Sequence, residues 1–563
     1  MENLTTARST RTVRTQLPAI LFAVGTLCLA SPILSQTESP NGAKQAPPIK
    51  VRTAMVLVPT IVTDRAGAHV SGLARDTFTV LQNGQPQKIA FFEHVQTQAE
   101  LMQRPAETEG VFTNRIEAGS QRLTIFVLDM LNSSLTEQAS GREKLLKLLS
   151  ESMEVTEPIC LLAIDSDGLK VIHDFTTDPA ELAEALKQTT AESSSKDLPQ
   201  ANPMASAFRD FHGWHSQSKG RAAAATSLRL QMLQATIYAR EVSESERDRL
   251  TLEMLREIGE SFTGIPGRKS MIWAKGGFPF EIDAASQFGS HERVLLPVYE
   301  NAWRALNRAN IAVYPLDVEE LLNTGYVSAS VGQQLPQHTD IRSTVSNLEE
   351  IAEATGGKLC NASTGAKACF RQAADDSTDY YLIGFYEHSE KLKPGWRKLS
   401  VKVQVPDFQV RARSGYYVGG VHDNPQKQKE DLAIALASPL DYTGIPLTVR
   451  WTATAESKTK DKRRVGFSFA IPPGAITVDE TDSNHLSLEF AAMATSETGS
   501  PVGSFSQSVD GRLSPAIASS IESQGVNYPG TIDLPPGQYT MSFAVRDILS
   551  RQIGTVSAPI VVH

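Results

Sequence analysis

Alternating hydrophobic and polar positions mark the first structured segment of the chain. Over residues 51–97, valines such as Val56 and Val58 alternate with other residues, as in a strand with one buried face. Two further apolar stretches flank Asn83-Gly84, a dipeptide that favours a two-residue hairpin turn. The pattern predicts a small N-terminal β unit of at least three strands.

The pattern changes between residues 120 and 378. Continuous apolar runs at 122–129 and 158–165 are typical of strands buried on both faces, and segments with helical periodicity follow them. Strands and helices in alternation predict the α/β class, with a Rossmann-like, doubly wound, mostly parallel sheet. Residues 190–226 are rich in Ser, Ala and Lys without a clear period, and we interpret them as an insertion into this domain.

Strand patterns return after the α/β segment. Residues 379–418 contain three strand-like stretches, which are candidates for pairing with the N-terminal unit. Residues 431–563 predict a C-terminal antiparallel β-sandwich of immunoglobulin or fibronectin type. Polar stretches at 36–50, 98–120 and 420–430 are interpreted as linkers.

The N-terminus carries a targeting pattern. Three arginines precede an uncharged apolar run from Leu17 to Ala30, which is shorter than the roughly 20 residues that a membrane-spanning helix needs. A basic start followed by a short apolar run is typical of a secretory signal peptide. We therefore expect residues 1–35 to direct a secreted or periplasmic protein without a further membrane span. An N-terminal anchor that is not cleaved is the alternative.

Composition narrows the class of function. There are 54 Lys and Arg against 63 Asp and Glu, a net charge of −9, and no long basic block that could contact phosphates. Nucleic acid is therefore not an expected partner. Four cysteines are too few for a disulfide scaffold. Cys360 and Cys369 are close enough in sequence to form one disulfide in an exported chain, whereas Cys160, in an apolar run, is expected to be a buried thiol.

Several segments, in a fixed order, resemble the von Willebrand factor A-related family described from acidobacteria. They include IFVLDMLNSS (125–134), GIPGRKSMIWAKGGFP (264–279), ANIAVYPLD (309–317) and the stretch from DDSTDYYLIGFYE to RARSGYYV (375–418). The resemblance covers about residues 50–418. It implies an α/β domain of von Willebrand factor A type over 120–378, with β domains on both sides.

The resemblance also implies a metal-ion-dependent adhesion site. In this family of folds the site uses Asp-x-Ser-x-Ser after the first strand, a later Thr and an Asp after the fourth strand, because a hard divalent cation prefers oxygen ligands. Asp129 and Ser133 match this pattern, but Leu131 replaces a serine and Gly276 replaces the last aspartate. Ser134 offers another oxygen, although a helix-capping role competes for it. The resemblance therefore implies a degenerate site.

Lys275 suggests another source of positive charge at the same place. At the end of the fourth strand it is expected beside Asp129, where its ammonium group would pair with the carboxylate in place of a cation. We therefore expect no cofactor, with Mg²⁺ or Ca²⁺ as the less favoured alternative. Asp317, at the end of the fifth strand, brings a further carboxylate to this edge, unless it serves as a helix cap.

These features predict an exported binding or adhesion protein that is not an enzyme. The degenerate site and the surface around Ser134, Gly276 and Asp317 would contact a protein partner in the envelope or outside the cell. One alternative is an exported α/β hydrolytic enzyme, which would show a deep pocket with titratable groups of shifted pKa at the sheet edge. Another is a structural envelope protein in which the α/β domain is only a scaffold.

Overall fold

The computed structural model describes residues 54–97, 110–115, 123–131, 146, 158–193, 246–275, 292–317, 341–360, 366–387, 395–418 and 425–563. These residues belong to one unit that spans Val51–His563. The expected signal peptide at 1–35, the linker at 36–50 and most of the insertion at 190–226 lie outside the described residues. Within the described ranges, no helix is long and apolar enough to cross a membrane.

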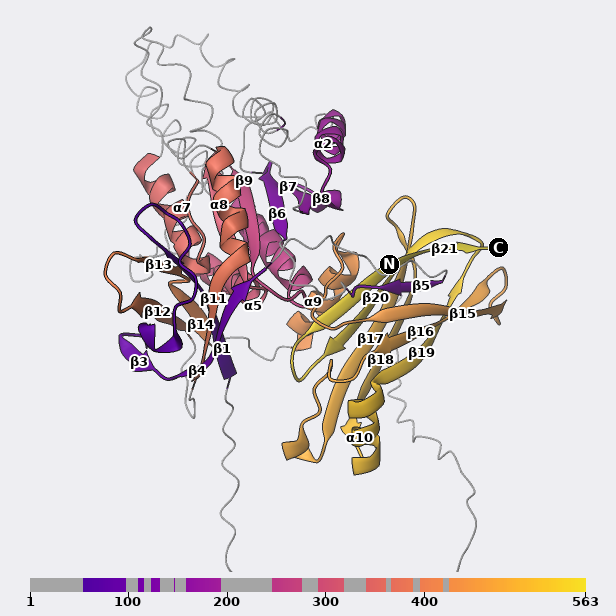
Figure 1. The fold of residues 1–563 in the computed structure, drawn as a ribbon. Helices are drawn as coiled ribbons and strands as arrows, with labels where there is room; N and C mark the ends of the chain where they lie inside the picture. Colours follow the sequence, from indigo (N-terminus) through magenta and orange to yellow (C-terminus); the bar gives the residue numbers. More distant parts are fainter. Residues whose placement is uncertain are drawn as a thin grey trace, which may run out of the picture. The chain divides into compact units, whose positions relative to one another are not determined.

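Five β-sheets account for more of the described chain than its helices do (Figure 1). Four are wholly antiparallel, and the fifth is a mixed sheet of four parallel strands and one antiparallel strand. The predicted class, α/β with a doubly wound, mostly parallel Rossmann-like sheet of von Willebrand factor A type, is therefore wrong. The prediction relied on the strands and helices of 120–378, whereas antiparallel ladders before and after that segment supply most of the strands.

Strands from two distant parts of the chain build the N-terminal β unit, which consists of two antiparallel sheets. The first sheet contains, in order, β13 (Gln409–Ala412), β1 (Ala54–Thr63), β11 (Asp379–Glu387) and β4 (Ile89–Gln96). The second contains, in order, β14 (Gly415–Val418), β12 (Gly395–Val403), β2 (Phe78–Gln82) and β3 (Gln85–Gln87). Alternate residues such as Val58, Ile383 and Phe385 form the shared core. Residues 379–418 thus complete the sheets that residues 54–97 begin.

The mixed sheet is buried on both faces by apolar side chains. Its strands, in sheet order, are β10 (Ile311–Asp317), β9 (Lys269–Lys275), β6 (Thr124–Asp129), β7 (Ile159–Asp165) and β8 (Gly168–Thr176). Successive side chains of a strand point to opposite faces, so Ile125 and Val127 enter one core cluster while Phe126 enters another. This double burial explains the continuous apolar runs in the sequence.

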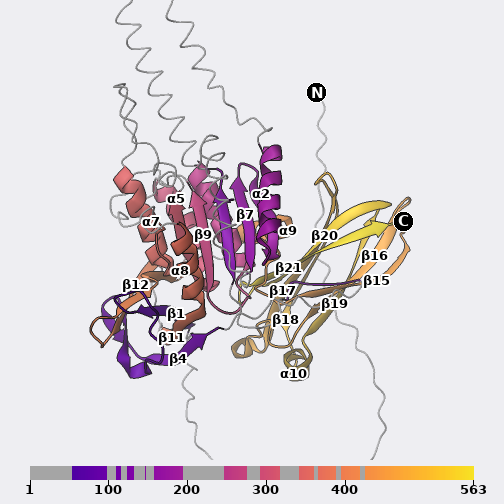
Figure 2. The ribbon, with the colours of Figure 1, turned by 45° about the horizontal axis from the view of Figure 1, so that its top comes forward.

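Helices pack against the mixed sheet (Figure 2) and contribute side chains to its two core clusters. One cluster receives Leu182 from α2 (Pro179–Ser193) and Phe370 from α8 (Ala366–Thr378). The other cluster receives residues of the helix 246–261, of α5 (Glu292–Arg308) and of α7 (Ile341–Thr355). Trp303 of α5 is among the largest fully buried side chains of the described chain.

Two four-stranded antiparallel sheets near the C-terminus enclose a third core. The first sheet contains, in order, β19 (Val526–Leu534), β16 (Arg463–Ile471), β15 (Thr448–Glu456) and β5 (Val111–Thr113). The second contains, in order, β18 (Pro501–Arg512), β17 (His485–Ser496), β20 (Gly537–Asp547) and β21 (Ile553–Val562). Phe467 lies at the centre, with its ring 5.6 Å from Phe469 and 5.0 Å from Phe543. Two helices accompany these sheets, α9 (Pro425–Ala437) and α10 (Pro515–Gln524). We call the sheets and helices together the C-terminal β unit.

Two of the polar stretches that we interpreted as linkers contain regular structure. β5, within the predicted linker 98–120, pairs with β15 of the C-terminal β unit, and α9 begins within the predicted linker 420–430. Short polar segments resemble linkers in sequence because the partners that order them lie far away along the chain. For β5, the partner strand is more than 300 residues downstream.

Asn114, directly after β5, fastens this strand to the C-terminal β unit. Its side chain is buried and donates hydrogen bonds to the carbonyl oxygens of Tyr442 at 2.7 Å and Ile445 at 2.9 Å. Its own oxygen accepts a hydrogen bond from the amide of Leu447 at 2.7 Å. One side chain therefore satisfies three backbone groups of the segment that leads into β15.

Candidate functional site

Four parallel strands of the mixed sheet end side by side at one edge. Asp317, the last residue of β10, pairs with Lys275, the last residue of β9, in the parallel ladder. Asp129, at the end of β6, follows directly on the last pair between β6 and β9, and Asp165 ends β7 one residue beyond the partner of Asp129. Because neighbouring strands lie about 4.8 Å apart, these strand ends bring three aspartates and one lysine to one edge of the sheet, here called the carboxyl edge.

Asp129 is enclosed within this edge, since only 3% of the residue is exposed. The amide of the next residue, Met130, donates to the carbonyl of Ile164 at 2.9 Å. Leu131, at the position where an adhesion site would need a serine, packs against the apolar core of the mixed sheet. The Asp129 side chain is therefore shielded from solvent. The hydrogen bond of Met130 and the packing of Leu131 fix the backbone that follows it.

The described donors at the carboxyl edge do not fit a divalent cation, which takes about six oxygen ligands. Leu131 has no side-chain oxygen, and Asp165 is engaged by the ammonium of Lys170 and the amide of Asp167. Across the ranges that the structure describes, no three His, Cys, Asp or Glu side chains are grouped to hold a metal. The remaining predicted residues of this edge lie outside the described ranges: Ser133, Ser134 and Gly276.

The backbone places Lys275 where the charge-replacement hypothesis needs it. β9 lies between β6 and β10 in the sheet, so Lys275 has Asp129 on one side and Asp317 on the other. The side chains of Lys275 and Asp317 are not part of the description. The ion pair between Lys275 and Asp129 therefore stays a prediction.

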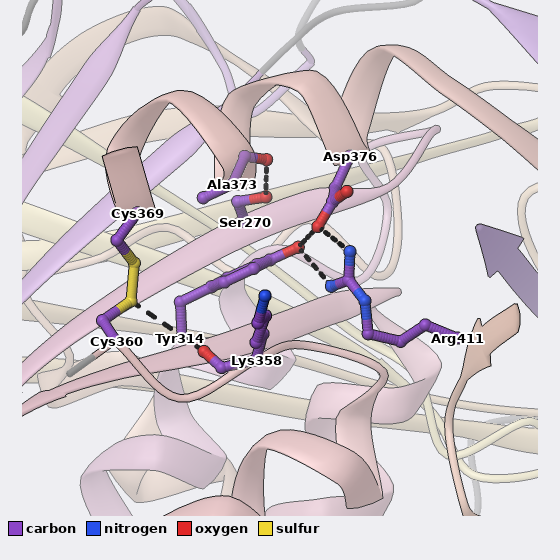
Figure 3. Close-up of a disulfide and its surroundings, with 8 residues drawn as sticks. All are labelled: Ser270, Tyr314, Lys358, Cys360, Cys369, Ala373, Asp376 and Arg411. Carbon is purple, nitrogen blue, oxygen red and sulfur yellow. Dashed lines mark hydrogen bonds and ion pairs between the residues drawn. A yellow bond between two sulfur atoms is a disulfide. The ribbon is translucent and has the colours of Figure 1, made fainter. Parts of the chain in front are cut away.

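A buried polar network, absent from the sequence-based predictions, lies where α8 meets the mixed sheet and β13. The fully buried carboxylate of Asp376, in α8, accepts a hydrogen bond from the Tyr314 hydroxyl at 2.5 Å and pairs with the guanidinium of Arg411 (Figure 3). Arg268, directly before β9, donates to the Tyr314 hydroxyl at 3.0 Å and to the Gly356 carbonyl at 2.9 Å. The network thus joins α8, β10 and β13.

The groups of this network keep one another in their ordinary charge states. Burial alone would raise the pKa of Asp376, but a hydrogen bond from His69 and the charges of Arg411 and Arg268 outweigh burial and hold that pKa below its usual value. Burial raises the pKa of Tyr314, so its hydroxyl remains a donor. Asp376 and Tyr314 therefore form a structural link, because their pKa values are shifted away from neutral pH.

Lys269 is a second buried group that the sequence did not single out. Its side-chain nitrogen donates to the carbonyl oxygens of Ile265 at 2.6 Å and Gly267 at 3.0 Å. Burial lowers the pKa of Lys269 to about 7, a shift of the kind found at catalytic lysines. However, the residue is 0% exposed. Its hydrogen bonds hold the turn that precedes β9, which is a structural role.

The sequence carries only faint signals for these buried groups. Arg268 and Lys269 form a charged pair directly before an apolar strand, and Asp376 is one of two adjacent aspartates at the end of a helix. Charged residues at the ends of elements are usually exposed, so neither pattern indicates burial. Only the tertiary contacts with Tyr314 and Arg411 reveal it.

The structure joins Cys360 to Cys369 in a disulfide (Figure 3). The amide of Cys360 donates to the carbonyl of Pro315 in β10 at 2.8 Å, and Cys369 lies in the first turn of α8. The disulfide therefore ties the start of α8 to β10, while Asp376 ties the other end of the same helix to the sheet. Cys160 is buried and is not part of this disulfide.

A depression of about 560 Å³, open to solvent, lies on the N-terminal β unit. Its titratable side chains belong to Arg75 and Asp76, and the Arg75 guanidinium is hydrogen-bonded to the carbonyl of Ile89. Its walls come from the turn Arg75–Thr77 and from β2, β3 and β4. It is lined by none of the residues singled out in the sequence.

Comparison with known proteins yields only distant similarities. No family model and no curated protein matches the chain. Among solved structures, the TFIIH p34 N-terminal domain has a TM-score of 0.21 at 11% identity, over 45% of this chain and 95% of that one. A glycosyl hydrolase family 2 member from Bacteroides cellulosilyticus DSM 14838 has a TM-score of 0.15 at 11% identity, over 33% of this chain and 20% of that one. Scores this low carry no argument, so the resemblance to the von Willebrand factor A-related family stays a prediction.

Proposed function

We propose that this chain is an exported, non-enzymatic binding protein that contacts a protein partner through the carboxyl edge of its mixed sheet. The register of the four parallel strands carries the proposal, because it aligns Asp317, Lys275 and Asp129 in one row, with Asp165 one residue beyond it. Loops that follow neighbouring parallel strands converge at such an edge, and ligands of such sheets bind there. Asp129 anchors the first of these loops from inside, and the residues beyond it make the contact.

The positions of the groups with shifted pKa values support binding rather than hydrolysis. A general acid or base needs a pKa near the working pH and contact with a substrate. Asp376 and Tyr314 are buried, and their pKa values are shifted away from neutrality. Lys269 has a pKa of about 7, but two backbone carbonyls occupy its donors. These three groups therefore offer no accessible general acid or base to a substrate.

A structural envelope protein is the second candidate, and one contact favours it. The Thr443 hydroxyl donates to the carbonyl of Ser261 at 2.7 Å and accepts from the amide of Gly264 at 2.9 Å. These hydrogen bonds fix the start of the C-terminal β unit to the end of the helix 246–261, as a rigid spacer requires. In that case the partner would bind the C-terminal β unit instead of the carboxyl edge.

Changing Asp129 and Ser133 together to alanine is expected to reduce recovery of the partner from an envelope fraction about tenfold or more, the effect of losing a contact that dominates an interface. The measurement is a pull-down with the tagged full chain, quantified for each recovered protein. The matched control changes Asp510 and Ser508 to alanine, two exposed positions on β18. Because Asp129 is buried, a melting curve must first show that the variant is folded. Equal recovery by the folded variant and the wild type would remove the carboxyl edge from the proposal.

We also propose that Lys275, and not a cation, balances the charge of Asp129. Adding Mg²⁺, Ca²⁺ or a chelator should then leave the melting temperature unchanged, whereas Lys275→Met should lower it. A cation present at 100 times its Kd would stabilise the fold by about 2.7 kcal/mol, a change that a melting scan detects readily. A chelator-dependent loss of stability in the wild type would show that an ion occupies this edge.

A further inference from the structure

His69 sits between two carboxyl-bearing residues of the α8–β11 junction. It belongs to residues 64–77, the loop between β1 and β2. Its Nδ1 lies 2.9 Å from the backbone carbonyl of Asp379, and its Nε2 lies 3.2 Å from the Oδ1 atom of Asp376. The side chain is only 17% exposed, so water cannot easily replace either contact.

Both neighbours of the His69 ring accept hydrogen bonds and cannot donate them. A backbone carbonyl is always an acceptor, and the carboxylate of Asp376 is ionised because its pKa lies below the usual value. A neutral imidazole has one N–H, so it can satisfy only one of the two oxygens. An imidazolium has two and satisfies both. The geometry around His69 therefore fits the protonated ring.

Charged and polar groups on both sides of His69 determine which protonation state of its ring is favoured. On the Asp376 side, Arg411 of β13 and Tyr314 of β10 bind the other carboxylate oxygen, Oδ2, and leave Oδ1 to His69. Arg268 adds a positive charge beyond Tyr314. On the Asp379 side, the carboxylate is held by three side chains: Ser71, His94 of β4 and Gln96 of β4.

The loop 64–77 has few other attachments to this junction. Ser71 donates to the Asp379 carboxylate at 2.6 Å. The Tyr381 hydroxyl of β11 accepts from the Leu73 amide at 3.0 Å and donates to the Val70 carbonyl at 2.8 Å. His69 is thus the residue of this stretch whose own hydrogen bonds to the junction depend on its charge state.

We propose that His69 is a pH-sensitive latch that holds the loop 64–77 on the α8–β11 junction when its ring is protonated and loosens it when the ring is neutral. The proposal concerns regulation of the fold and does not depend on the proposed binding function. It links pH to the attachment between the N-terminal β unit and α8. Asp376 and the disulfide fix this helix to the mixed sheet.

The electrostatics agree with this geometry. The hydrogen bond to Asp376 is the largest influence on the pKa of His69, and together with the nearby negative charges it raises that pKa above 6.5 despite the opposing effect of burial. A raised folded-state pKa means that the folded loop binds its proton more tightly than the unfolded loop does. The stabilisation is then complete below the unfolded pKa and is lost as the pH rises through the folded pKa.

Hydrogen exchange in the intact chain tests the latch directly. After correction for intrinsic rates, amides of residues 64–77 should exchange about fivefold more slowly near pH 5.5 than near pH 8, the effect of one net hydrogen bond. His69→Gln keeps a donor for one oxygen but cannot titrate, so the pH dependence should disappear. His173→Gln, on β8, is the matched control and should behave as the wild type in this loop. The same pH dependence in His69→Gln and the wild type would overturn the proposal.

A second measurement remains decisive even if His69→Gln folds poorly. The side-chain NMR signals of the wild type, followed from acid to alkaline pH, report the titration of each histidine in the native state. The His69 signal should show a pKa above 6.5, the ordinary value for histidine. A pKa for His69 at or below the ordinary value would contradict the latch.

Discussion

Asp376→Ala is expected to lower the free energy of unfolding by about 4 kcal/mol, because removing one partner of a buried ion pair costs roughly 3–5 kcal/mol. The substitution leaves the guanidinium of Arg411 without its carboxylate and the Tyr314 hydroxyl without its acceptor. It also removes the oxygen that faces His69. Denaturant unfolding at neutral pH measures the loss.

Asp375→Ala is the matched control for this prediction. Asp375 is the preceding residue of the same helix, and it is exposed, so its replacement should change stability by no more than about 0.5 kcal/mol. The folded-state pKa of Asp376 is lowered from 3.8, so the carboxylate stabilises the fold above that pH and the benefit is lost as the pH falls. If Asp376→Ala and Asp375→Ala were equally stable, the network would not hold α8 to the sheet.

Asn114→Ala is expected to lower the free energy of unfolding by about 3 kcal/mol, because it removes three hydrogen bonds to buried backbone groups at roughly 1 kcal/mol each. The affected groups belong to Tyr442, Ile445 and Leu447. The loss should appear in the unfolding of the C-terminal β unit, whose sheet β5 completes. Hydrogen exchange of β15 measures the local effect, and denaturant unfolding measures the global one.

Arg115→Ala provides the comparison for Asn114, since Arg115 is the next residue and is exposed. It should be close to neutral, because surface substitutions away from special contacts rarely exceed about 0.5 kcal/mol. Rapid exchange of β15 in both variants, or in neither, would show that the side chain of Asn114 does not fasten the strand.

Local patterns in the sequence predicted many individual strands correctly. The hairpin at Asn83-Gly84 connects β2 and β3, and the apolar runs 122–129 and 158–165 contain β6 and β7. These predictions succeeded because a tight turn and a strand buried on both faces each leave a pattern in residues that are adjacent in the sequence. The class prediction failed because it relied on the strands and helices of 120–378, whereas most strands belong to antiparallel sheets outside that segment.

Long-range contacts account for the features that the sequence did not reveal. β5 is three residues long and polar in its surroundings, and only its ladder with β15 makes it a strand. Arg268, Tyr314 and Arg411 meet Asp376 from separate elements. Each of these residues alone resembles an ordinary surface or core residue, so no local pattern indicates the network.

The candidate site was predictable in position but not in detail. The ends of apolar strands predicted that Asp129, Lys275 and Asp317 would share one edge, and the register places their backbones in adjacent strands. Burial of Asp129 was not predictable, because it depends on the packing around the strand end. The role of Leu131 was not predictable either. From the sequence it was interpreted as a lost metal ligand, whereas in the structure it packs against the core.

Site-specific photo-cross-linking in the envelope tests the carboxyl edge most directly. One cross-linking residue replaces Ser134, five residues after the end of β6 in the sequence. The other replaces Ser508, on strand β18 of the C-terminal β unit. The account predicts a discrete cross-linked protein from position 134 and none from position 508. A cross-link from position 508 alone would contradict the account and assign the contact to the C-terminal β unit.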